Sequence, residues 1–273
     1  MNCWICGNVA DSEEHKFKAS LLKRSFGKKY GPKNPHVFIQ GEVYTYLENY
    51  KSKALKFPKV ICTRCNNTLT KPHDNAFDIF VEYSIKNYKL LIENGTINFE
   101  LIYGNDWQVQ SNNFYKYIAK HMGCKIVTGN KPFDITDLSS YIKNDYLTPK
   151  LYITFDLKEG IHNTMMEFDL QYPHLYNSTT FYHNINQREF FGGWITIKSL
   201  SVVWIYANNF ELNNNRMYKE SKHKLKISYQ KDFDLQKKFI DPLKLINFYE
   251  YGGEESLENL NRYFSGILGN LES

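Results

Sequence analysis

The sequence lacks long hydrophobic runs and is poor in cysteine and proline. Of its 273 residues only five are Cys and eight are Pro. No uncharged apolar run approaches the ~18 residues that a membrane-spanning helix needs. The residues after Met1 show neither the basic region nor the apolar core of a signal peptide. We therefore expect no membrane association and a cytoplasmic location.

Core-forming residues, in contrast, are abundant. Aromatic side chains make up 16 % of the chain and hydrophobic side chains 42 %, with 23 % charged. This composition can fill a packed core, which argues against intrinsic disorder. The length fits one large domain or two ordinary ones.

The positive charge is concentrated near the start of the chain. The formal net charge is +5, but residues 1–75 hold 13 Lys and Arg against six Asp and Glu, so this part carries +7 and the remainder −2. A basic segment on a near-neutral body favours a polyanionic partner such as a nucleic acid. A solvated, Lys-rich surface without a partner is the alternative.

Four of the five cysteines form two C-x-x-C pairs, Cys3 with Cys6 and Cys62 with Cys65. Each pair places two thiolates on one tight turn, and two such pairs complete the tetrahedral shell of a structural zinc site. Disulfides are not expected in a chain without an export signal, because they form in oxidising compartments. A thioredoxin-like site would need only one C-x-x-C pair. We therefore expect one structural Zn²⁺, with Cys124 as an ordinary buried thiol.

Polar residues suited to phosphodiester chemistry accompany the two cysteine pairs. Glu14 and His15 follow the first pair, Asn66 comes directly after Cys65, and Asp74 lies eight positions further on. The order C-x-x-C, E-H, C-x-x-C-N and D resembles the zinc-bearing subgroup of the HNH endonucleases, which have a ββα-metal (treble-clef) active site. The resemblance covers residues 1 to about 80.

This resemblance implies an enzyme that hydrolyses DNA phosphodiester bonds, and restriction or phage defence is the setting that we favour. His15 matches the general base that activates water, and its ordinary pKa near neutrality suits that task. Glu14 and Asn66 match ligands of a catalytic divalent metal, and Asp74 matches an acidic residue after the second pair. Their oxygen atoms would suit Mg²⁺ or Mn²⁺. RNA as the substrate stays an open alternative.

Basic residues follow His15 closely and could neutralise the phosphates on either side of a cut. The candidates for phosphate contact are Lys16, Lys18, Lys23, Arg24, Lys28 and Lys29. Nothing in the sequence indicates an oligomeric state or an activating ligand.

The chain also departs from the HNH pattern. Lys18 stands where the family usually has Pro, Thr70 stands where it has Gly, and the middle Asn that orients the base would fall near Phe57 and Pro58. These departures keep a second hypothesis open: a catalytically inactive, zinc-stabilised module that binds nucleic acid or protein. His15 could then be a surface residue and Asp74 a helix cap, and His73 is predicted to be a surface side chain.

Hydrophobic spacing predicts the local elements. Helices are predicted at residues 16–25, 75–86, 114–122 with Gly123 as the terminator, 137–143, 232–240 and 254–269. Strands are predicted at 36–40, 42–47, 151–157, 190–197, 200–206 and 224–229, and residues 88–92 and 97–103 are predicted to form a hairpin around Gly95.

The predicted fold class is α+β. Residues 1–86 would form the N-terminal ββα-metal (treble-clef) zinc module. Residues 87–273 would form a larger mixed α+β domain whose role would be target recognition or effector sensing. Its aromatic residues lie mostly in strand patterns, which favours core packing over base stacking.

Overall fold

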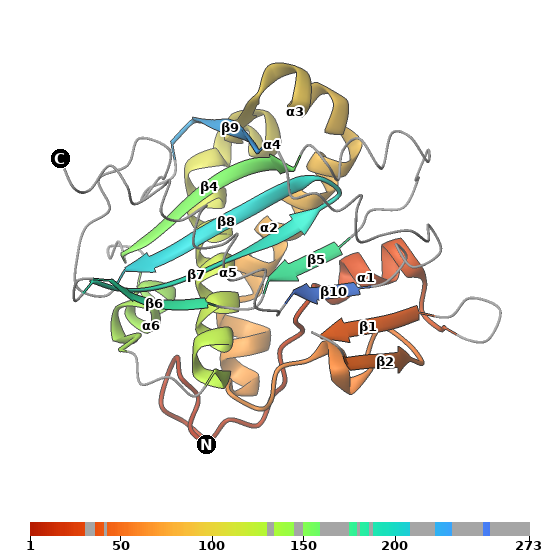
Figure 1. Cartoon of the computed structure of the whole chain (residues 1–273). Helices are drawn as coiled ribbons and strands as arrows, with labels where there is room; N and C mark the ends of the chain where they lie inside the picture. Colours follow the sequence, from red (N-terminus) through yellow and green to blue (C-terminus); the bar gives the residue numbers. More distant parts are fainter. Residues whose placement is uncertain are drawn as a thin grey trace.

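The structure is a computed structural model of the whole chain (Figure 1). It describes residues 1–30, 36–40, 43–129, 134–144, 150–158, 175–178, 181–185, 188–207, 222–230 and 248–251. The predicted helices at 232–240 and 254–269 lie outside the described residues. None of the described helices combines the length and the apolarity that crossing a membrane requires.

The fold is mixed α+β, which confirms the predicted class. The helices are α1 (Ala19–Phe26), α2 (Lys71–Lys86), α3 (Tyr88–Asn94), α4 (Phe99–Tyr103), α5 (Trp107–Thr128) and α6 (Thr136–Lys143). Short turns of 3₁₀ helix lie at η1 (Lys53–Leu55) and η3 (Gly104–Asp106), and η2 (Cys65–Leu69) is a π-helical turn.

The strands form one mixed sheet in the order β2-β1-β10-β5-β7-β8-β4-β9-β3, with β6 also paired to β7. Their bounds are β1 (His36–Gln40), β2 (Val43–Leu47), β3 (Thr96–Asn98), β4 (Leu151–Lys158), β5 (Leu175–Ser178), β6 (Phe181–Ile185), β7 (Arg188–Ile197), β8 (Leu200–Ala207), β9 (Lys224–Gln230) and β10 (Phe248–Tyr251). All eight residues of β8 are buried, as expected for a central strand of continuous apolar sequence.

Helices α2 and α5 run side by side behind the sheet (Figure 1). Aromatic rings join the layers: Phe77 of α2 stacks on Tyr117 of α5 at 3.9 Å between centroids, and Phe80 lies 5.7 Å from Phe155 of β4. One hydrophobic cluster extends from Cys3 to Ile227. Residues before and after position 86 therefore pack in the same hydrophobic core. The division of the chain into two domains at that position stays a prediction.

The predicted hairpin at residues 88–103 is wrong. Residues 88–94 form helix α3, and Gly95 ends it in the left-handed conformation, with φ 58°. Asn98 then caps α4 by accepting hydrogen bonds from the backbone N–H groups of Glu100 and Leu101. A glycine with positive φ serves a helix end as well as a hairpin turn, so the local sequence did not distinguish the two.

The predicted end of the central helix at Gly123 is also wrong, because α5 continues to Thr128. Trp4, which lies between the first two cysteines, packs against Gly123. A Cβ atom at Gly123 would lie 2.3 Å from the ring carbons Cη2 and Cζ2 of Trp4. Glycine is needed here for the close approach of an indole ring and not for a helix end.

Replacing Gly123 with Ala should therefore destabilise the protein, although alanine is the better helix former by about 1 kcal/mol. The clash with Trp4 should outweigh that gain and leave a net loss of about 1–3 kcal/mol, as for other overpacked cores. Urea unfolding of Gly123→Ala and of the control Gly129→Ala would test this. Gly129 ends the same helix, and its Cβ would meet only the backbone oxygens of Lys125 and Ile126 at 3.4 and 3.5 Å. Equal stabilities of the two variants would contradict the assignment.

Candidate zinc centre and buried cation site

The first C-x-x-C pair sits on a tight turn. The backbone N–H of Cys3 donates to the carbonyl of Asn8 at 2.6 Å, and the N–H of Gly7 donates to the carbonyl of Cys3 at 2.8 Å. Gly7 has φ 81°, a conformation that residues with a side chain rarely adopt. The turn places the sulfur atoms of Cys3 and Cys6 in one cluster, where both can reach the same metal ion.

The second pair lies where the chain enters η2. The N–H of Cys65 points at the sulfur of Cys62, 3.4 Å away. Two backbone hydrogen bonds hold the pairs together: the N–H of Trp4 donates to the carbonyl of Val60 and that of Ser12 to the carbonyl of Ile61. These bonds bring four cysteines from two distant segments to one place.

The four sulfur atoms of Cys3, Cys6, Cys62 and Cys65 all lie within 4.8 Å of one another, and Cys6 and Cys62 are 3.6 Å apart. Tetrahedral zinc with bonds of about 2.3 Å requires sulfur separations close to these values. The backbone N–H of Asn8 lowers the pKa of Cys6 to about 7, which favours the thiolate. The cluster can hold a metal ion such as zinc, and Cys124, which is buried, lies outside it.

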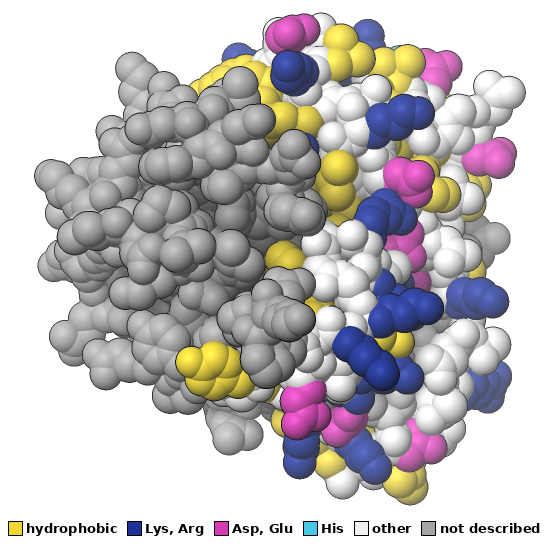
Figure 2. Space-filling view, turned by 90° about the vertical axis from the view of Figure 1, so that its right-hand side faces the viewer, with side chains coloured by type: hydrophobic (Ala, Val, Ile, Leu, Met, Phe, Trp, Pro, Cys, Tyr) yellow, Lys and Arg dark blue, Asp and Glu magenta, His cyan; other side chains and the backbone are white. Residues whose placement is uncertain are grey.

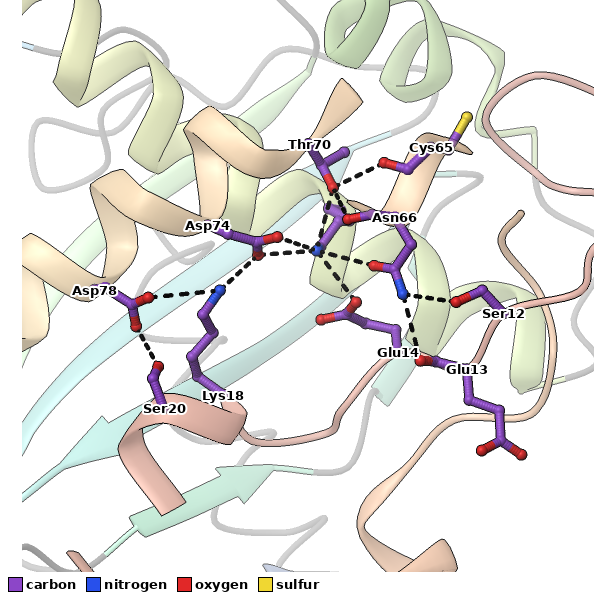
Figure 3. Close-up of polar contacts among 11 residues, drawn as sticks. Ser12, Glu13, Glu14, Lys18, Ser20, Cys65, Asn66, Thr70, Asp74 and Asp78 are labelled. Carbon is purple, nitrogen blue, oxygen red and sulfur yellow. Dashed lines mark hydrogen bonds and ion pairs between the residues drawn. The ribbon is translucent and has the colours of Figure 1, made fainter. Parts of the chain in front are cut away.

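Three predicted active-site residues come together at a second place (Figure 3). Their side-chain oxygens surround the ammonium group of Lys120, which the sequence analysis did not single out. The Lys120 Nζ atom lies 2.9 and 3.2 Å from the two carboxylate oxygens of Asp74, 3.2 Å from Oε2 of Glu14 and 3.5 Å from Oδ1 of Asn66. The Thr70 hydroxyl is 3.4 Å away.

Different elements supply these oxygens. Glu14 lies on a short antiparallel segment, where its carbonyl accepts from the N–H of Phe57 at 2.8 Å. Asn66 belongs to the π-helical turn η2, a geometry often found at functional sites. Its side-chain amide donates to Ser12 Oγ at 3.0 Å and to the Glu13 carbonyl at 3.3 Å, which turns Oδ1 toward Lys120.

Asp74 lies in the first turn of α2 and also pairs with a second lysine. Lys18 Nζ is 3.0 Å from Asp74 Oδ1 and 3.8 Å from Asp78, which in turn accepts a hydrogen bond from Ser20 at 2.5 Å. Lys18 is therefore engaged by two carboxylates, with only 15 % of its side chain exposed.

Lys120 is charged although its side chain is fully buried. Burial alone would lower the pKa of Lys120, but the carboxylates of Glu14 and Asp74 outweigh it, and the pKa is raised above its ordinary value. Burial also raises the pKa of Glu14, and the charges of Lys120 and Lys18 oppose that shift. The charged form of Lys120 is therefore favoured at this position.

The oxygens of Glu14, Asn66 and Asp74 are of the kind that Mg²⁺ or Mn²⁺ prefers. In the structure, however, the point on which they converge holds the Lys120 nitrogen. A divalent ion needs ligands at about 2.0–2.1 Å and could not share this point with an ammonium group. The residues as placed do not fit a catalytic Mg²⁺ or Mn²⁺.

His15 is the predicted general base. Among the described residues, no hydrogen bond or ion pair joins its side chain to Glu14, Asn66 or Asp74. It pairs with Lys56 in an antiparallel bridge, and alternation along such a segment turns neighbouring side chains to opposite sides. Burial, followed by the charge of Lys56, lowers the pKa of His15 to about 4. Its ring bonds to the backbone of Tyr50, and its Nε2 is buried without a hydrogen-bond partner among the described residues.

The predicted phosphate-contacting residues lie in several environments. The Lys16 and Lys23 ammonium groups lie over the rings of Phe38 and Tyr50, at 4.7 and 4.6 Å from the centroids. Arg24 is 3.5 Å from Glu82 on α2. Lys28 and Lys29 are exposed. Lys18, as described above, is paired with Asp74 and Asp78.

Two findings at this site were not predicted from the sequence. His73, expected at the surface, is buried in α2 with 4 % exposure, so that prediction is wrong. Lys120 was missed, because α5 carries polar residues all along its sequence and its burial is visible only in the structure. All residues from Phe114 to Ile126 are buried, and a lysine in such a place requires a partner.

Comparison with known proteins finds no matching family model, no matching curated protein and no matching solved structure. The likeness to HNH endonucleases thus rests on the motif residues.

The cysteine cluster predicts that the purified protein carries about one zinc per chain. Cys62→Ser should lose the metal and unfold the N-terminal segments that the cluster holds together, because binding energy at such a site is folding energy. Cys124→Ser is the matched control and should keep full zinc content. Metal analysis combined with thermal unfolding would measure both effects. A folded, metal-free protein with four freely reactive thiols would contradict the zinc assignment.

Proposed function

We propose that this chain is a zinc-stabilised module that binds DNA through its basic N-terminal part and does not cut it. The observation that supports binding is a cluster of exposed cations around one aromatic ring. We call it the basic patch. It consists of Lys23 and Lys51, whose ammonium groups lie over Tyr50, and of the exposed Lys28 and Lys29 on the segment paired with it.

The basic patch is assembled by backbone pairing between two segments. Lys29 forms a bridge with Asn49, and the N–H of Tyr30 donates to the carbonyl of Glu48 at 2.8 Å. The ammonium groups of Lys23 and Lys51 lie 4.6 and 5.8 Å from the centroid of the Tyr50 ring. The bridge at Lys29 brings the backbone of the turn after α1 next to the segment that carries Tyr50.

Such a patch suits a phosphate backbone better than a single anion. Its lysines are exposed, and the first 75 residues carry a net charge of +7. Lysines spread over a surface bind a polyanion by displacing its counterions, about one for each phosphate that they neutralise. Lys and Arg side chains are frequent over the described part of the face in Figure 2, with Asp and Glu among them.

Changing both Lys28 and Lys29 to Ala should weaken binding to duplex DNA about equally for all sequences. The slope of log affinity against log salt should fall by about 1.8, because two phosphate contacts are removed. The control is Lys143→Ala, an exposed lysine on α6, which lies away from α1 (Figure 1). Fluorescence anisotropy at several salt concentrations measures both quantities, and single-stranded RNA can replace DNA in a parallel series. Binding that ignores ionic strength would refute the proposal and favour a protein partner.

A metal-dependent endonuclease is the second candidate, with a possible role in restriction or phage defence. The observation that favours it is the meeting of Glu14, Asn66 and Asp74, far apart in the sequence, around one cation. His15 is neutral at pH 7, as a general base must be, but a pKa lowered to about 4 makes it a weaker base than an ordinary histidine. We place this candidate second because Lys120 fills the position of the metal and His15 makes no described contact with the acidic pair.

Plasmid cleavage in Mg²⁺ and in Mn²⁺ separates the two candidates. We expect the zinc-loaded wild-type protein to bind the plasmid and leave it intact. If it cuts, and His15→Ala is slower by about 10²–10⁴ while still binding, the endonuclease is correct. His223→Ala is the control for loss of a histidine outside the N-terminal part. Cutting that survives His15→Ala unchanged would show that another group is the base.

A further inference from the structure

We propose that the Lys120 ammonium takes the place of a divalent cation in a site built from Glu14, Asn66, Thr70 and Asp74, so that removing this lysine creates a divalent-cation site. The inference concerns the site next to the zinc centre. It does not depend on the basic patch or on DNA binding.

The first argument is the number of oxygen atoms around the ammonium. Both carboxylate oxygens of Asp74, one of Glu14, the amide oxygen of Asn66 and the hydroxyl of Thr70 all lie within 3.5 Å of Nζ. An ammonium group has only three N–H donors and cannot serve all of these oxygens with good geometry. A surplus of oxygens around one point is typical of the six-coordinate or higher shells of hard metal ions.

The second argument is charge. The carboxyl groups of Glu14, Asp74 and Asp78 meet two cationic partners, Lys120 and Lys18. Burial raises the pKa of Glu14, and the charge of Lys120 opposes that shift. Lys18 and a divalent ion at the position of Lys120 would together supply three positive charges for the three carboxylates. The carboxyl groups need positive charge close by to be buried at low cost, and in this chain Lys120 supplies it at the centre of the site.

The third argument is that Lys120 cannot easily leave. Its side chain has 0 % exposure, and its helix is held by the stack of Tyr117 on Phe77 and by the packing of Trp4 on Gly123. For the side chain to swing out, α5 would have to move from the shared core. A divalent ion added to the intact protein therefore meets an occupied site.

Mn²⁺ binding to the zinc-loaded, full-length protein tests the proposal. Electron paramagnetic resonance of free Mn²⁺ reports how much ion is bound. We expect Lys120→Met, whose side chain lacks the charge and ends one atom before the position of Nζ, to bind about one Mn²⁺ per chain at least tenfold more tightly than the wild type. Adding Glu14→Gln to that variant should abolish the gain. Lys116→Met is the control, since it removes a buried lysine one turn earlier on the same helix whose ammonium lies over the Tyr141 ring.

Two results would overturn the proposal. The first is a folded Lys120→Met protein that binds Mn²⁺ no better than Lys116→Met. The second needs no stable variant at position 120: wild-type protein that binds Mn²⁺ tightly, with the binding lost in Glu14→Gln, would show that Lys120 does not occupy the cation position. If Lys120→Met is unfolded in metal-free buffer, Mn²⁺ should restore its cooperative thermal transition. Failure of Mn²⁺ to do so also counts against the site. Failure of DNA binding leaves all these outcomes unchanged.

Discussion

The buried ammonium of Lys120 joins parts of the chain that are far apart in sequence. Its partners Glu14, Asn66 and Asp74 come from an extended segment, from η2 and from the first turn of α2. Buried charges are tolerated only when paired, and loss of one member of a buried pair typically costs about 3–5 kcal/mol. The position of α5 against the N-terminal segments is therefore set by charge as well as by apolar packing.

The cysteine cluster and the lysine site are neighbours through η2. Cys65 belongs to the cluster, the next residue Asn66 faces Lys120, and the hydroxyl of Thr70 donates to the carbonyls of both at 2.9 and 3.1 Å. A metal ion that fixes Cys65 would also fix the orientation of Asn66 and Thr70. The wide π-helical turn accommodates both roles within a few residues. A metal ion held by the cysteine cluster would in this way be coupled to the geometry around Lys120.

Helix α1 connects the lysine site to the basic patch. Just before and within its first turn, Lys18 and Ser20 face the carboxylates of α2, while Lys23 in its last turn lies over Tyr50. Leu21 and Leu22 between them are buried and hold the helix on the core. A short amphipathic helix thus presents acid-paired groups at one end and exposed cations at the other.

The sequence by itself determined the donor atoms and most local elements. Spacing along the chain places the two sulfur atoms of each C-x-x-C pair on one turn, and strands such as β4, β7 and β8 follow from apolar runs. Only the tertiary structure decided what the acidic residues bind. Lys120 reaches Glu14 and Asp74 because α5 packs on α2, and no local pattern encodes that meeting. The side of the strand on which His15 lies likewise depends on its pairing with Lys56, and the continuation of α5 through Gly123 depends on the ring of Trp4. These are contacts between distant segments, and local spacing carries no information about them.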